Sequence, residues 1–170
     1  LMTGIITDTG GFRHSGITPE TFEFTADLIR LGVDIPDIYK RTLRTKTRAN
    51  FELTKRIMDR LEILESGRVT FTYMTQKDEK EVMAEPGDHE GLVDIGMDIE
   101  GVEVSIFIRQ KENEEAYKIS MRSGTDSINV SDICLMFGGG GHPRAAGALI
   151  QGNIEQVKEK VLNEVRKVLK

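Results

Sequence analysis

The sequence predicts an α/β (α+β) protein in which a mixed β-sheet is flanked by helices. Residues 102–110 and 116–123 alternate in polarity on either side of the polar turn KENEE, which is the pattern of a β-hairpin. Residues 154–168 carry apolar side chains at helical spacing. Strand and helix signals alternate along the rest of the chain, so both kinds of element are expected to share one layered core.

The first part of the chain is expected to contain a strand followed by helices. Residues 2–7 include the apolar Ile5 and Ile6 and precede the turn-forming sequence DTGG, which predicts a strand and a turn. Thr18 followed by Pro19 is the pattern of a helix N-terminus, and Gly32 is the candidate C-cap of that helix. A short helix is predicted at about 36–43.

A longer helix is predicted at about 46–65, because apolar side chains recur at helical spacing from Ile57 to Leu64. Its many Arg, Lys and Glu residues favour a connector between two units, so we place the domain boundary within it. The predicted organisation is residues 1–45, the connector 46–65, and a second domain 66–170.

The second domain is predicted to be a sheet with helices around it. Its expected elements are, in chain order, a strand at 69–74, helices at about 77–83 and 89–99, the two hairpin strands, a helix at about 130–137 and a strand at 145–150. Asn153 with Gln156 three residues later is a capping-box pattern, which predicts the start of the last helix.

The composition excludes several classes of protein. A net charge of -5 argues against a general nucleic-acid coat, so any site for a polyanion must be a pocket. The single Cys134 excludes an intrachain disulfide and suits a reducing compartment. No apolar run approaches the roughly 20 residues of a membrane span, and no leader pattern is present. We therefore expect a cytoplasmic protein. Because it begins directly in an apolar run, we also expect it to be a piece of a longer chain.

Residues 135–147, LMFGGGGHPRAAG, contain the most unusual pattern of the sequence. The four consecutive glycines are Gly138, Gly139, Gly140 and Gly141. They fit neither a P-loop nor a dinucleotide fingerprint, because no Gly-Lys-Ser/Thr follows and a proline occupies position 143. Glycines with positive φ can direct several N–H groups into one anion-binding concavity, to which His142 and Arg144 would add donors and charge. The alternative is a helix C-cap followed by a tight turn.

Other candidate residues lie at the ends of predicted strands. Arg109 and Arg122 each end a hairpin strand, and Ser123 follows Arg122; a guanidinium suits phosphate, although solvated edge charges are the alternative. Asp8 follows the first predicted strand, where α/β sheets place active-site carboxylates, but it also suits an Asx turn. One carboxylate cannot complete a metal site. His89 and Glu90, in GDHEG, lack a His-Glu-x-x-His context and are interpreted as solvated loop or cap residues.

Two blocks of the chain resemble a known family. GIITDTGGFRHSGITPETFEFTADLI resembles the last conserved block of the DHH phosphoesterase domain, and YKISMRS with INVSDICLMFGGGGHPRAAGA resembles its DHH-associated C-terminal domain. The subfamily most similar to them is the oligoribonuclease and phosphoadenosine-phosphate phosphatase (nano-RNase) type. The resemblance implies that residues 1–45 end an α/β DHH catalytic domain and that 66–170 bind the substrate. It also implies two metal ions, usually manganese, that activate water.

The resemblance also assigns roles to residues of this chain. Asp8 matches a metal-ligand aspartate. Independently of the resemblance, His14 is interpreted as a rim residue, because it lies with Arg13 in the loop after Asp8. The family's substrate-binding positions match Arg122, Ser123, Gly138, Gly139, Gly140, Gly141, His142 and Arg144 and, less closely, Arg109. The Asp-His-His and Asp-x-Asp signatures are absent, so most of the catalytic domain is expected upstream and this chain is expected to be inactive alone.

The resulting hypothesis is the nucleotide-binding portion of a metal-dependent phosphoesterase that acts on short oligoribonucleotides or adenosine bisphosphate-type nucleotides. Two alternatives stay open: an RNA-binding appendage like that of alanyl-tRNA synthetases, and part of a single-strand DNA exonuclease. The expected partners are short RNA or adenine nucleotides and a second copy of the chain. Self-association through residues 1–30, or disorder there, is expected, because Ile5, Ile6 and Phe12 would be uncovered without the rest of a sheet.

Overall fold

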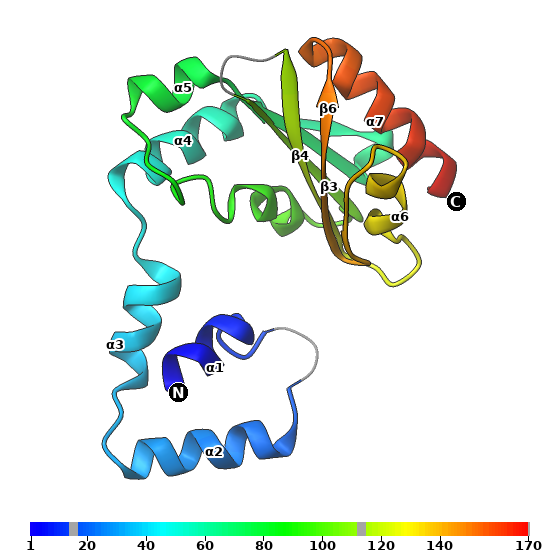
Figure 1. The fold of residues 1–170 in the computed structure, drawn as a ribbon. Coiled ribbons are helices and arrows are strands. Elements are labelled where there is room, and N and C mark those ends of the chain that lie inside the picture. The colour runs from blue at the N-terminus through cyan, green and yellow to red at the C-terminus, as the bar shows by residue number, and fades with distance from the viewer. Residues whose placement is uncertain (14–16, 112–114, 170) are drawn as a thin grey trace. The chain divides into compact units, whose positions relative to one another are not determined.

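The computed structural model describes residues 1–13, 17–111 and 115–169 and divides the chain into two compact units, 1–47 and 48–170 (Figure 1). Within the described residues, no helix is both long enough and apolar enough to cross a membrane. His14 lies outside the described residues.

The first unit is helical. Its elements are α1 (Met2–Asp8), α2 (Pro19–Arg30), α3 (Ile35–Tyr39) and the π-helical turn η1 (Lys40–Arg44). The strand predicted at 2–7 is wrong. Met2, Ile5 and Ile6 also fit the i, i+3, i+4 spacing of a helix, and the Thr9 hydroxyl donates to the Ile5 carbonyl at 2.6 Å. A segment with so few apolar residues does not fix the period, and here the helix buries Met2 and Ile6 on one face.

Helix α2 begins as predicted. The Thr18 and Thr21 side chains form a reciprocal capping box, Pro19 is the first helical residue, and Gly32 has a φ of +85° just after the end. Ile6 is buried within this unit, and the Phe12 ring stacks on Phe22 with centroids 5.4 Å apart. The exposed apolar surface therefore lies on α2 rather than at Ile6, and self-association stays a prediction.

The second unit is built on a six-stranded mixed sheet of order β1-β2-β3-β4-β6-β5. The strands are β1 (Glu62–Leu64), β2 (Val69–Met74), β3 (Val104–Gln110), β4 (Ala116–Ser123), β5 (Gly140–His142) and β6 (Ala145–Gln151). Only the β2–β3 pair is parallel among these strands. The fold class and the β3–β4 hairpin are confirmed. Strand β5, inside the glycine block, was not predicted.

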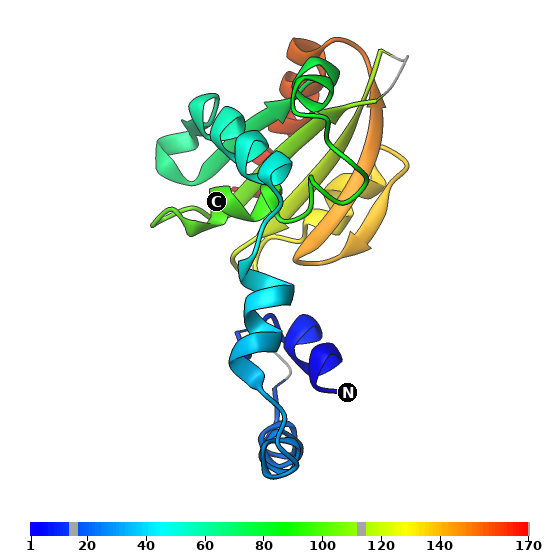
Figure 2. The same cartoon turned by 90° about the vertical axis from the view of Figure 1, so that its left-hand side faces the viewer.

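Helices cover the two faces of this sheet unequally (Figures 1 and 2). Helices α6 (Val130–Leu135) and α7 (Ile154–Val168) pack on one face and enclose the larger core with side chains from β2, β3, β4 and β6. Helix α4 (Arg48–Asp59) and the 3-10 helix η3 (Leu92–Asp98) pack on the other face, where Leu53 and Ile57 contact a smaller apolar cluster. The capping box of Asn153 and Gln156 is confirmed.

The helix predicted at 46–65 is shorter in the structure. Helix α4 ends at Asp59, residues 62–64 form β1, and Glu65–Gly67 form the 3-10 turn η2. The residues of β1 pair with β2, and Glu62 accepts hydrogen bonds from Lys158 of α7 at 2.6 Å. These partners are remote in sequence, so helical spacing alone could not reveal that the segment leaves the helix.

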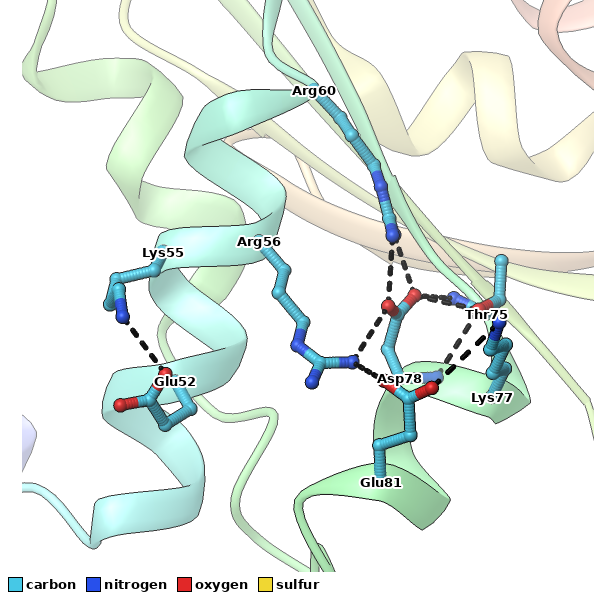
Figure 3. A network of polar contacts seen from close by, with 8 residues as sticks. All are labelled: Glu52, Lys55, Arg56, Arg60, Thr75, Lys77, Asp78 and Glu81. Atoms are coloured by element: carbon cyan, nitrogen blue, oxygen red, sulfur yellow. Dashed lines mark hydrogen bonds and ion pairs between the residues drawn. The ribbon is translucent and has the colours of Figure 1, made fainter.

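Helix α5 (Gln76–Glu81) is fastened to α4 by a buried carboxylate (Figure 3). Asp78 accepts hydrogen bonds from Arg60, at 2.5 and 2.8 Å, and from Arg56 at 3.2 Å. The backbone N–H and hydroxyl of Thr75 also donate to Asp78, at 2.8 and 2.6 Å, and complete a capping box. This network holds α5 and the loop after it beside the end of β3.

Candidate functional site

Part of the sheet face that carries η3 displays polar side chains from β3 and β4. The antiparallel register sets Arg109 opposite Lys118 and Phe107 opposite Ser120. Opposed residues in antiparallel strands project from the same face, and residues two apart along a strand share that face. Lys118, Ser120 and Arg122 therefore form one row along β4, and Arg109 lies beside the Lys118 end of this row.

These side chains line a cavity of about 430 Å³, which we call the β4 groove. Its lining residues are His89, Glu90, Gly91, Val93, Phe107, Arg109, Lys118, Ser120 and Arg122. Three of its side chains are cations, Glu90 is an anion, two are apolar, and Ser120 contributes a hydroxyl. Such a groove can orient a phosphate by charge-assisted hydrogen bonds while the apolar part contacts an uncharged portion of the ligand.

Arg122 is held at the groove by an exposed partner. Its Nε donates to Asp94 Oδ1 at 2.8 Å, and the Asp94 side chain is 54% exposed. An ion pair this accessible to water contributes little to stability, so an incoming anion can replace the carboxylate at small cost. Arg122 therefore suits the phosphate-binding role expected of it, which remains a proposal.

Arg109 has two neighbours at the end of the groove nearest α5. Its Nη1 donates to Glu79 Oε1 at 3.1 Å and lies 3.4 Å from Nδ1 of His89. An arginine only donates, so this contact requires an unprotonated His89 Nδ1. Burial, and then the charge of Arg109, lower the pKa of His89 below its ordinary value, which favours that neutral form. The interpretation of His89 as a solvated loop residue is wrong, because the loop folds back onto β3.

We expect His89 to make folding stability depend on pH. Its pKa is lowered in the folded state, so its contribution is fully present above the ordinary histidine value of 6.5 and is lost as the pH falls below it. His89→Gln should flatten the fall in unfolding free energy between pH 7.5 and 5.5, measured by urea denaturation. An unchanged profile in His89→Gln would contradict this assignment.

Lys118 and Ser120 were missed from the sequence. The signal was present in AYKISMRS, where Lys118, Ser120 and Arg122 occupy alternate positions between buried Ile119 and Met121. This period of two marks a common face, but the sequence analysis singled out only Arg122, the residue at the end of the pattern. Within the described part of the chain, Lys118 forms no ion pair or hydrogen bond, so its charge is available to a ligand.

The four glycines serve different purposes in the structure. Gly138 has a φ of +72° and ends α6: its N–H donates to the Leu135 carbonyl, and the N–H of Gly139 donates to the Cys134 carbonyl. This is a Schellman C-cap. Two of the N–H groups expected in an anion-binding concavity are thus engaged by the helix. The helix-cap alternative describes Gly138 correctly.

Of the remaining glycines, two pack closely against β6 and one has open space where a side chain would begin. A Cβ on Gly139 would overlap the backbone of Gly147 and Ala148, although φ is not positive there. Gly141 has a φ of +152° and lies against Ala145 and Ala146. Only Gly140 combines a φ outside the positive range with open space around its Cβ position. Among the four, it is the glycine that the fold does not require.

His142 reaches the same sheet face through strand pairing. It is opposite Ala145, which is opposite Arg122, so the three residues form a row across β5, β6 and β4. Two strand spacings separate His142 from Arg122, about 10 Å. His142 is exposed and therefore lies at the edge of the sheet beside the β4 groove.

The other sequence candidates are not among the residues that line the β4 groove. Ser123 is buried and its hydroxyl donates to the Thr125 carbonyl at 2.8 Å, which stabilises the turn after β4. Arg144 pairs with Asp126 at 2.8 Å. Asp8 is exposed at the end of α1 in the first unit. Across residues 1–13, 17–111 and 115–169, no three His, Cys, Asp or Glu side chains gather to hold a metal ion, so these residues do not fit a manganese site.

Comparison with known proteins agrees with this architecture. Residues 67–170 match the family model described as the DHHA1 domain. The chain belongs to the DHHA1 domain family. The resemblance based on the glycine and histidine block is thereby confirmed. The β4 groove and the β5–β6 hairpin, which contains the glycines, are both parts of this DHHA1 domain.

Curated relatives of this DHHA1 protein include proteins named for their action on nucleotides or RNA. It is 33% identical over 99% of its length to a bifunctional oligoribonuclease and PAP phosphatase NrnA of Thermus thermophilus, of which it covers 50%. It is 28% identical to the protein of that name from Mycoplasma genitalium, of which it covers 51%. It is also 29% identical over 94% of its length to an A-adding tRNA nucleotidyltransferase of Aquifex aeolicus, of which it covers 19%. The chain thus spans about half the length of the NrnA proteins.

A solved structure shows the same fold. An exopolyphosphatase-related protein from Bacteroides fragilis superposes with a TM-score of 0.86 at 24% identity, covering 98% of this chain and 49% of that one. A pGpG-specific phosphodiesterase, PggH, from Vibrio gives a TM-score of 0.52 at 15% identity over 98% of this chain and 56% of its own. At these identities the likeness concerns the fold alone.

Proposed function

We propose that this chain is the substrate-binding portion of a phosphoesterase that hydrolyses short oligoribonucleotides or adenosine bisphosphate-type nucleotides. The observation that carries the proposal is the β4 groove, where Arg122, Lys118 and Arg109 lie on one face of a DHHA1 domain. In a chain of net charge -5, this local concentration of cations favours a polyanionic ligand of limited size. The names of the NrnA relatives support a nucleotide as that ligand.

Manganese has no part in the binding that we propose for this chain. Asp8 alone does not form a metal site, and the described residues offer no cluster that does. The groove supplies cations and a hydroxyl, which bind and orient a phosphate ester but do not by themselves cleave it. Hydrolysis, and the metal ions that the family resemblance implies, belong to the proposal for a complete enzyme.

A second candidate function is an RNA-binding module without phosphoesterase activity. The specific observation in its favour is the similarity over 94% of this chain to a protein named for its action on tRNA, of which the chain covers only 19%. A module of this kind would bind a folded RNA more tightly than a short, unstructured one. The two candidates therefore differ in the length and structure of the RNA they prefer.

Arg122→Ala and Lys118→Ala should each lower the affinity for a short oligoadenylate by about ten- to a hundredfold, because each loses a charge-assisted contact to phosphate of about 1.5–3 kcal/mol. Lys160→Ala removes the same charge from α7, on the opposite face, and should bind as wild type does. Isothermal titration calorimetry with the 170-residue chain measures the affinity, and the melting temperature of each variant checks that it is folded.

The choice of titrant separates the candidate functions. Tight binding of a short oligoadenylate and weaker binding of tRNA supports the phosphoesterase portion, and the reverse order supports the RNA-binding module. A preference for single-stranded DNA of equal length would favour the exonuclease alternative. Wild-type affinity in both Arg122→Ala and Lys118→Ala would remove the β4 groove from the proposal.

A further inference from the structure

A second cavity, of about 470 Å³, adjoins the β4 groove. It lies between α5, the loop that follows α5, and the end of β3, and we call it the α5 pocket. His89 and Arg109 line both hollows, so these two side chains stand at the passage from one to the other. A ligand that occupies the groove can therefore continue past Arg109 into the α5 pocket.

The β4 groove alone is longer than one phosphate group can span. Arg122 pairs with Ser105, whereas Arg109 lies four residues further along β3, so the two arginines are separated by about 13 Å along the strands. Lys118 lies directly opposite Arg109. The cations therefore mark at least two positions for phosphate, one at Arg122 and one at Arg109 and Lys118.

The α5 pocket combines cationic, apolar and amide groups. Lys80 and Lys111 add positive charge to that of Arg109, whereas Glu79 and Glu85 are its acidic residues. Among the described contacts of Arg109, both the bond to Glu79 and the approach to His89 use Nη1, so Nη2 and Nε remain for a ligand. The cations suit a phosphate at the mouth of the pocket.

Apolar groups form another side of this pocket. Met83, Ala84 and Pro86 are among its lining residues. Met83 occupies the position after α5 where a Schellman cap usually has glycine: its φ is +53°, its N–H donates to the Lys80 carbonyl, and the N–H of Ala84 donates to the Glu79 carbonyl. The Met83 side chain is 84% exposed, so this backbone conformation is not repaid by packing within the chain. A thioether at such a site makes favourable contacts with an aromatic ring.

We propose that the α5 pocket binds a further nucleoside of an oligonucleotide whose phosphates occupy the β4 groove, with its base against Met83 and its phosphate at Arg109 and Lys111. This inference rests on the proposed function, because the β4 groove must first bind the oligonucleotide. The ligand of the chain would then have at least two nucleotides, and the β4 groove and the α5 pocket would each contribute separately to the affinity.

The test measures affinity against ligand length. Isothermal titration of the 170-residue chain uses AMP and 5′-phosphorylated oligoadenylates of two, three and five nucleotides. The variant Met83→Gly with Lys111→Ala removes the ring contact and one cation, and glycine suits the positive φ at position 83. Its melting temperature should therefore be at least that of the wild type. Lys77→Ala, on α5 but not lining the pocket, is the matched control.

In the wild type, affinity should rise from AMP to the three-nucleotide ligand. The double variant should lose at least tenfold in affinity for the three-nucleotide ligand and less than twofold for AMP, and Lys77→Ala should bind all ligands normally. Wild-type affinity of the double variant at every length would overturn the α5 pocket while Arg122→Ala still tests the β4 groove. Equal wild-type affinity for AMP and for all longer ligands would also overturn it. Absence of binding at every length would overturn the proposed function as well.

Discussion

Asp78→Ala is expected to lower the free energy of unfolding by about 3 kcal/mol, near the lower end of the range for breaking a buried ion pair. The Asp78 side chain is only 4% exposed and is bonded to Arg60, Arg56 and Thr75. Its removal leaves two guanidinium groups facing a dry site and also deletes the capping box of α5. The arginines keep about 30% exposure, which lets water offset part of the loss.

A neighbouring carboxylate is the matched control. Glu81 also pairs with Arg56, at 2.6 Å, but is 46% exposed, so Glu81→Ala should cost less than about 1 kcal/mol. Asp78→Asn keeps the shape and a capping acceptor and should lie between the two. Urea denaturation at pH 7 measures all three variants. Equal costs for Asp78→Ala and Glu81→Ala would contradict the importance of the buried position.

The stabilisation that Asp78 provides should depend on pH. Burial alone would raise the pKa of Asp78, but hydrogen bonds from Arg60 and Thr75 outweigh it and hold that pKa well below its ordinary value. A lowered pKa means that the stabilisation is complete above the unfolded value, about 3.9, and is lost as the pH falls below it. The stability difference between wild type and Asp78→Asn should therefore be constant from pH 7 to about 5 and shrink towards pH 3.

Gly139→Ala is expected to destabilise the second unit by about 2–3 kcal/mol, the upper part of the usual range for overpacking. The added methyl group would overlap the carbonyl oxygen of Gly147 and the Cα and Cβ atoms of Ala148, all of which belong to β6. They cannot rotate away as a flexible side chain would, so β5 would have to separate from β6. The cause is close approach of two strands and not a positive φ.

Gly140→Ala is the control on the adjacent residue. Its Cβ would meet only Leu135, at 3.9 Å, and its φ is not positive, so the stability should change by less than about 1 kcal/mol. Thermal and urea unfolding of both variants measure the contrast. Similar destabilisation by the two substitutions would show that the hairpin needs glycine for backbone freedom at both positions.

Part of the candidate site could be predicted from the sequence. Arg122 and Arg109 were found because they end strands of a hairpin whose polarity alternates, and the structure places both in the β4 groove. His89 could not be found in this way, since its position depends on a loop that returns to β3 from 20 residues earlier. Ser123 was a candidate because it follows Arg122 and matches a position of the resembled family, yet neighbours in a strand face opposite sides, and it is buried.

The sequence by itself determined the elements whose signals are local. Capping residues at Thr18 and Asn153 and alternation in 116–123 act over a few residues, so they mark helix starts and a strand without knowledge of the fold. Tertiary structure alone decided whether residues 2–7 form a helix or a strand and where α4 ends, because strand pairing and burial depend on partners far along the chain. It also decided why the glycines are there: Gly138 caps a helix, Gly139 and Gly141 allow the close approach of β6, and only Gly140 has room for a side chain without a positive φ.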